Sequence, residues 1–109
     1  MKIFIEFNKT SLGFLTKTEE GFDFVAFANE IEKLETENSI VFKMFNLNKK
    51  GTKSYSHIPS FFRKFLPSKE RMDLMKKANI KETDSEFDKL FKLAGLNSMA
   101  INFKLRQGE

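Results

Sequence analysis

The spacing of apolar residues changes along this chain, and that change most constrains its fold. In residues 1–27 apolar and polar side chains alternate, as at Ile3, Ile5 and Phe7, which is typical of strands with one buried face. Two polar turns interrupt the alternation, and the second contains Gly21, which tolerates tight turns. This opening therefore predicts an antiparallel meander. Its predicted strands are residues 2–7, 12–16 and 22–27.

The next segment predicts one helix and one strand. Phe27, Ile31 and Leu34 have helical spacing, so we expect a short helix over 27–35. Residues 39–45 are rich in β-branched and aromatic side chains and predict a fourth strand. Residues 46–57 contain Asn, Lys, Gly and Ser but little apolar material, so they are expected to form a basic loop.

Helical periodicity dominates the second half of the chain. One apolar stripe predicts a helix that begins at Pro59 and ends before Pro67. Ser68 is a candidate cap for a second helix, with Met72 and Met75 on its inner face. The residues expected to be buried in the first stripe are Ile58, Phe61, Phe62 and Phe65.

A third helix is expected to start at a capping box formed by Thr83 and Glu86 and to end at Gly95. Its buried side chains are expected to be Phe87, Leu90, Phe91 and Ala94.

Alternation returns near the end of the chain. Met99, Ile101, Phe103 and Leu105 alternate with polar residues, which predicts a last strand over 99–106 that joins the sheet. The predicted fold class is α+β: a small antiparallel, barrel-like sheet of about five strands, packed with three to four short helices. The length of 109 residues suits a single domain, residues 1–109.

Composition argues against an enzyme. The chain has no Cys and one His, His57, so thiolate metal sites are excluded and a zinc site is not expected. The five Gly are isolated, so no phosphate-binding loop is predicted. Fourteen Phe against one Tyr and no Trp indicate a core built largely from phenylalanine. We expect no catalytic residues, cofactor or metal.

The sequence also predicts a cytoplasmic location. No apolar run reaches the roughly 18 residues of a membrane-spanning helix, and the first ten residues turn polar too early for a signal peptide. The lack of Cys permits a reducing compartment.

Positive charge is concentrated in the middle of the chain. Residues 1–37 carry a net charge of −4, residues 38–81 carry +9 and residues 82–109 carry −1. Such a basic block can bind nucleic acid or an acidic protein. A binder of single strands needs exposed aromatic residues among its cations, whereas the Phe residues of this block lie on a core stripe. We therefore expect no direct nucleic-acid contact, but a nucleic-acid-binding module using 43–81 stays an alternative.

Residues 58–67, IPSFFRKFLP, resemble the F-F-x-N-L-L-P segment in the N-terminal subdomain of the HipA kinase family. Residues 12–16 are similar to the family's early V-G-x-L strand, and 39–47 to its L-S-x-S-L-P-L strand. Residues 87–100 resemble F-x-L-L-x-x-I-G-x-D-S-x-G-A. The order of these segments is also the family's. The chain departs from the pattern after Pro67, where the family has Glu-Gly and often an aromatic residue.

The resemblance implies an interaction protein. The chain ends just after the last predicted strand, so we expect a stand-alone member similar to the HipS antitoxins of three-component HipB–HipS–HipT toxin–antitoxin systems. The implied partners are a HipT-like Ser/Thr kinase toxin, which the antitoxin neutralises, and through that complex a HipB-like helix-turn-helix DNA-binding protein; no membrane is involved. A non-inhibitory structural subunit of a split HipA-like kinase is an equally open alternative.

The candidate partner-binding site is the corner at Pro67. The buried stripe before it leaves two cations pointing outward, and a proline corner lowers the ordering cost of binding. The resemblance places the segment that follows on the kinase-facing side, where we expect charge-assisted contacts with acidic groups. The 46–57 loop is the alternative surface. The candidate residues are Arg63, Lys64, Pro67, Ser68, Lys69 and Arg71.

Overall fold

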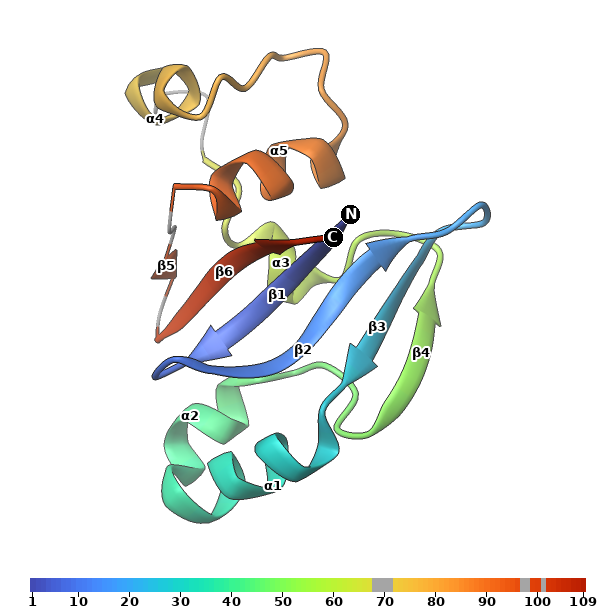
Figure 1. Cartoon of the computed structure of the whole chain (residues 1–109), viewed down its shortest axis with the longest axis vertical. Helices are drawn as coiled ribbons and strands as arrows, with labels where there is room; N and C mark the ends of the chain where they lie inside the picture. The colour runs from blue at the N-terminus through green and yellow to red at the C-terminus, as the bar shows by residue number, and fades with distance from the viewer. Residues whose placement is uncertain (68–71, 97–98, 101) are drawn as a thin grey trace.

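A strongly curved antiparallel sheet forms the centre of the structure, a computed structural model that describes residues 1–67, 72–96, 99–100 and 102–109. Its strand order is β4-β3-β2-β1-β6-β5 (Figure 1). The predicted α+β class is confirmed, although the sheet does not close into a barrel. The strands are β1 (Lys2–Phe7), β2 (Thr10–Lys17), β3 (Phe22–Ala26), β4 (Gly51–Tyr55), β5 (Met99–Ala100) and β6 (Phe103–Gly108).

The predicted meander is confirmed. Strands β1, β2 and β3 pair in succession, and Asn8 and Lys9 make the first turn with φ of 53° and 69°, the left-handed conformation that tight hairpin turns require. Strand β6 pairs with the free side of β1, with Arg106 opposite Phe4. The first and last long strands are therefore neighbours in the middle of the sheet (Figure 1).

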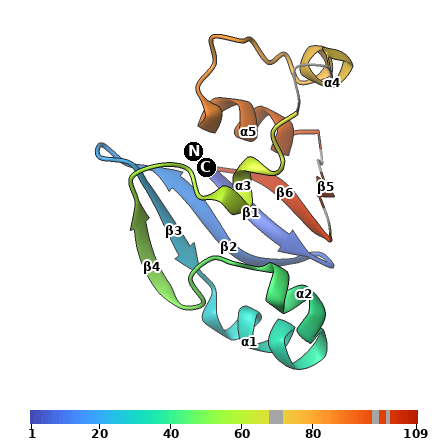
Figure 2. The same cartoon turned by 180° about the vertical axis from the view of Figure 1, so that it is seen from behind.

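Five helices are present among the described residues, and none is long and apolar enough to cross a membrane. The predicted helices at 27–35 and after residue 83 are confirmed as α1 and α5. In Figure 2, α3 lies across the back of the sheet, while α4 stands beyond α5 at one end. The helices are α1 (Ala28–Glu37), α2 (Ser39–Met44), α3 (Ser60–Arg63), α4 (Met72–Lys77) and α5 (Glu86–Ala94).

Two predictions between α1 and α3 are wrong. The segment predicted as a strand over 39–45 is helix α2, because the Asn38 side chain accepts a hydrogen bond from the Val41 amide at 3.2 Å and caps a helix there. The segment predicted as a loop over 46–57 contains the edge strand β4. Its residues are exposed apart from the half-buried Tyr55, so it lacks the apolar alternation that marks a strand in sequence.

The end of the chain is a hairpin instead of one strand over 99–106. Met99 pairs with Lys104 and Ala100 with Phe103, so the chain reverses between β5 and β6. Of the alternating apolar residues, Phe103 and Leu105 are buried, whereas Ile101 lies outside the described residues.

The helix caps also differ from prediction. Ser85, not Thr83, caps α5: its Oγ accepts from the Asp88 amide at 3.1 Å. The proposed cap of the second helix, Ser68, lies outside the described residues. Met72, predicted on an inner face, is 62% exposed, and α4 has no buried residue.

The core lies between the back of the sheet and α3, α5 and the segment after α2. Phe24, Phe45, Phe61, Phe62 and Phe103 are fully buried, and the rings of Phe61 and Phe103 lie with their centroids 5.1 Å apart. The prediction of a phenylalanine core is confirmed. Among the predicted core residues Phe61, Phe62, Phe65, Phe87 and Leu90 are buried, and Phe91 is half-buried.

Candidate partner-binding site

The corner at Pro67 begins with α3, whose two sides differ. Phe61 and Phe62 are buried, whereas Arg63 and Lys64 are exposed, as predicted from the apolar stripe. Arg63 Nε donates to Glu86 Oε2 at 3.1 Å and so connects α3 to the first turn of α5. Both side chains are largely exposed, so this pair contributes at most about 1 kcal/mol to stability.

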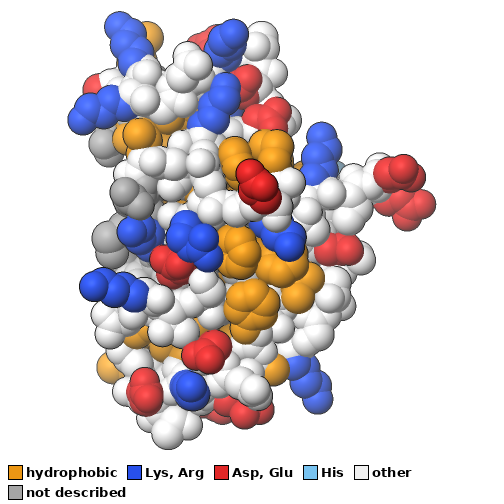
Figure 3. Space-filling model, in the orientation of Figure 1, with side chains coloured by type: hydrophobic (Ala, Val, Ile, Leu, Met, Phe, Trp, Pro, Cys, Tyr) orange, Lys and Arg blue, Asp and Glu red, His pale blue; other side chains and the backbone are white. Residues whose placement is uncertain are grey.

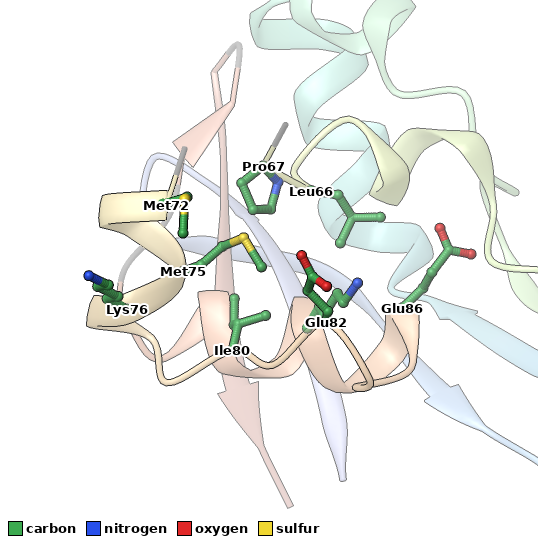
Figure 4. A pocket seen from close by; sticks show the side chains of 9 residues that line it. Leu66, Pro67, Met72, Met75, Lys76, Ile80, Glu82 and Glu86 are labelled. Carbon is green, nitrogen blue, oxygen red and sulfur yellow. The ribbon is translucent and has the colours of Figure 1, made fainter. Parts of the chain in front are cut away.

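An open groove lies beside this corner, between α4 and the start of α5 (Figure 4). Its volume is about 690 Å³. Figure 4 shows Met75 reaching from α4 toward Leu66 and Ile80. The apolar lining residues are Leu66, Pro67, Met72, Met75 and Ile80, and the charged ones are Lys76, Glu82, Glu86 and Lys89.

One wall of the groove is held firmly to α5. The Lys92 ammonium donates to Asp84 Oδ2 at 2.7 Å and to the Asn79 carbonyl at 3.0 Å. Asp84 Oδ2 also accepts from the Lys81 amide at 2.9 Å. These hydrogen bonds hold the pKa of Asp84 below its ordinary value, and the one from the Lys81 amide contributes most. The loop that carries Ile80 is therefore fixed in place.

The opposite wall is lightly packed. Helix α4 has six residues and none of them is buried, while Met72 is 62% exposed. Methionine is unbranched and polarizable, so it adapts to surfaces of different shape. An apolar groove with one fixed wall and one methionine wall suits the docking of apolar side chains from a partner.

The structure brings together part of the predicted site. Pro67 lines the groove, and Arg63 forms an ion pair with Glu86, which also lines it. Lys64 is exposed on the same corner. Ser68, Lys69 and Arg71 lie outside the described residues. Sequence reasoning missed the groove because it assigned Met72 and Met75 to the core. The available signal was a methionine pair on a short segment that otherwise carries one Asp, one Leu and two Lys.

Several cations of the basic block over 43–81 make contacts within the protein. The Lys49 ammonium donates to the carbonyls of Phe45 and Leu47 and lies over the Phe45 ring at 4.8 Å from its centroid. Burial lowers the pKa of Lys49. Lys53 lies over the Tyr55 ring, and Arg63 is paired with Glu86. Several of these cations are therefore engaged in contacts within the folded protein.

No cluster that suits a metal ion is found in the described part of the chain. No three His, Asp or Glu side chains there are placed to hold a metal ion. His57 is exposed at the end of the segment after β4.

The apolar part of the groove's lining suits the binding of apolar side chains. The sequence matches no protein-family model and no curated protein, so the groove and its surroundings carry the functional argument.

Proposed function

We propose that this protein is the antitoxin of a three-component toxin–antitoxin system, which binds and neutralises a HipT-like Ser/Thr kinase through the groove beside Pro67. The observation that carries the proposal is this open apolar groove. It lies directly after the segment that resembles the HipA family, on the side that the resemblance implies faces the kinase. In this proposal the chain itself is not an enzyme, needs no cofactor and acts in the cytoplasm.

The fold supports the proposal. An antiparallel, curved sheet with packed helices is the architecture that the resemblance implies. Of the segments that resemble the family, 12–16 lies in β2 and 87–94 in α5, whereas 39–47, which resembles a strand of the family, begins with helix α2. The groove's apolar floor with charged residues of both signs at the rim resembles the centre and rim of a protein interface.

The test is inhibition of a candidate HipT-like kinase by the purified protein. We expect kinase activity to fall as the protein is added. Met72→Glu should weaken kinase binding at least about tenfold, because a partner that fills the groove must bury the new charge. Met72 is exposed, so the substitution should leave the fold intact. Met44→Glu is the matched control: Met44 is 39% exposed on α2, at the opposite end of the molecule (Figure 1).

The other outcomes are also decisive. A kinase that is active only in the presence of this protein would make it the structural subunit of a split kinase. Equal kinase binding by the Met72→Glu and Met44→Glu variants would show that the interface lies outside the groove. Residues 46–57 would then be the next candidate. ATP turnover by the pure protein that is lost on His57→Ala would contradict the non-enzymatic part of the proposal.

A further inference from the structure

The front of the sheet carries an aromatic cluster that no helix of the described chain covers. Phe4 and Phe14 are directly opposite each other on β1 and β2, and their ring centroids are 5.5 Å apart. Phe27 follows β3, with its ring 6.0 Å from that of Phe14. All three are half-buried. Figure 3 shows apolar side chains gathered at the centre of this face, which Figure 1 places over β1, β2 and β3.

Cations lie directly over two of these rings. The Arg106 guanidinium is 4.4 Å from the centroid of Phe4, and the Lys2 ammonium is 4.6 Å from that of Phe14. Arg106 Nε donates to Glu6 Oε2 at 2.7 Å, which holds the guanidinium beside the ring.

Phe4 itself leans across β6. A Cβ added to Gly108 would come within 2.2 Å of Phe4 Cε2, so the ring occupies the space that the glycine leaves open. The Phe4 ring lies over β6, and the planar Arg106 guanidinium lies over that ring, so the two groups form a flat stack at the surface.

The charges of this face favour an anionic partner. The register places Lys2, Lys104 and Arg106 on it, with Glu6 and Asp23 as its acids. Glu6 and Arg106 form an ion pair with each other, while Asp23 accepts from the neutral Ser54 hydroxyl at 2.7 Å and keeps its charge, so the excess of positive charge on this face is small. Lys2 and Lys104 make no ion pair within the described residues. Exposed aromatic rings interleaved with cations are the combination that single-stranded nucleic acids require, because bases stack on rings while cations hold phosphates.

We propose that this aromatic face binds single-stranded nucleic acid. The Lys2 ammonium, which lies over Phe14 in the free protein, moves to a phosphate, and a base stacks on Phe14 in its place. A second base stacks on the Phe4–Arg106 pair, and the Lys104 ammonium contacts another phosphate. Duplexes are not expected to bind equally well, because their bases are already stacked on one another. The face is separate from the groove at Pro67, so the inference does not depend on the kinase proposal.

The experiment is a fluorescence anisotropy titration of labelled oligothymidine and oligouridine 12-mers and of a duplex of the same length. We expect both single strands to bind more tightly than the duplex, and the difference between them reports whether DNA or RNA is preferred. Phe14→Leu keeps an apolar side chain but removes the stacking surface. It should weaken binding about 5- to 100-fold, the usual cost of one lost stacked base.

Matched controls separate stacking from general effects. Phe42→Leu changes another half-buried phenylalanine that also lies beside a lysine, on α2, and should leave binding unchanged. Lys2→Met should reduce the slope of log affinity against log salt by about 0.7, whereas Lys50→Met should not. Phe14→Trp should restore binding. The chain has no other Trp, so the fluorescence of that variant should be quenched by a stacked base.

Three results would overturn the inference, provided that circular dichroism shows the variants folded. One is the absence of single-strand binding at protein concentrations up to about 100 µM, the weak end of non-specific binding. Another is equal binding of duplex and single strands. The third is a dimer of the protein that Phe14→Leu dissociates, because a second copy would then cover this face.

Discussion

At the scale of single residues, the stability of the protein depends on how completely each phenylalanine is enclosed. Phe62 has no exposed surface and its ring contacts those of Phe24 and Phe61, at centroid distances of 5.9 and 5.8 Å. Phe91, on α5, is only half-buried. The same substitution should therefore have different costs at the two positions.

Phe62→Ala should lower the free energy of unfolding by about 3–5 kcal/mol, because it leaves a cavity that the sheet and α3 cannot close. Phe91→Ala should cost clearly less, because part of that ring is already hydrated. Urea unfolding of the two variants measures the difference. Equal losses would contradict the burial described for the two rings.

The Asp84 carboxylate should make stability depend on pH. Its pKa is lowered in the folded protein, so its contribution is present above its ordinary pKa of about 3.9 and is lost as the pH falls through the lowered value. Asp84→Asn should be less stable than the wild type at pH 7, and the gap should close as the pH falls below about 4. Urea unfolding at several pH values checks this, and a gap that stays constant down to pH 2 would argue against the charge as its cause.

At the scale of elements, the position of a helix start depends on which side chain reaches the free amides. The Thr83 hydroxyl and Glu86 have the spacing of a capping box, but the helix begins two residues later, with Ser85 as its cap. Asp84 is meanwhile held by Lys81 and Lys92, so the turn before Ser85 is set by contacts with α5.

Ser85→Ala should destabilise the protein by about 1 kcal/mol, because the Asp88 amide loses its acceptor. Thr83→Ala should change stability by less than about 0.5 kcal/mol, as for other surface positions. Thermal unfolding of both variants distinguishes the two caps. A larger loss for Thr83→Ala would restore the capping box predicted from the sequence.

At the scale of the whole molecule, the two ends of the structure differ in how tightly they are packed. Strands β1 and β6 each pair on both sides within the sheet. Helix α4 has no buried residue and stands apart from the sheet in both views (Figures 1 and 2). The α4 wall of the groove at Pro67 should therefore open locally more easily than the sheet.

Hydrogen exchange should report this difference. Amides of α4 should exchange at least about 100-fold faster than those of β1, because local opening of α4 exposes little apolar surface whereas β1 opens only on global unfolding. Binding of the kinase should slow exchange in α4 and leave α1 unchanged. Equal protection of α4 and β1 in the free protein would show that the groove's methionine wall is rigid.

The sequence alone predicted those elements in which the spacing of apolar residues follows the buried face of the element. The alternation in β1 and the stripes of α1 and α5 reflect contacts with a single apolar surface, so their periods are visible locally. The same reasoning identified Phe61, Phe62 and Phe65 as core residues and Arg63 and Lys64 as exposed residues.

The rest was decided by tertiary contacts. Strand β4 exists because β3 offers it a partner, and its exposed residues carry no periodic signal. Helix α2 depends on the Asn38 cap, although its composition favours a strand. Met72 and Met75 line a groove instead of the core because α4 stands beyond α5. The aromatic face also required the structure, since Phe4, Phe14 and Phe27 belong to three separate segments that only the pairing of β1 with β2 and β6 brings beside Lys2 and Arg106.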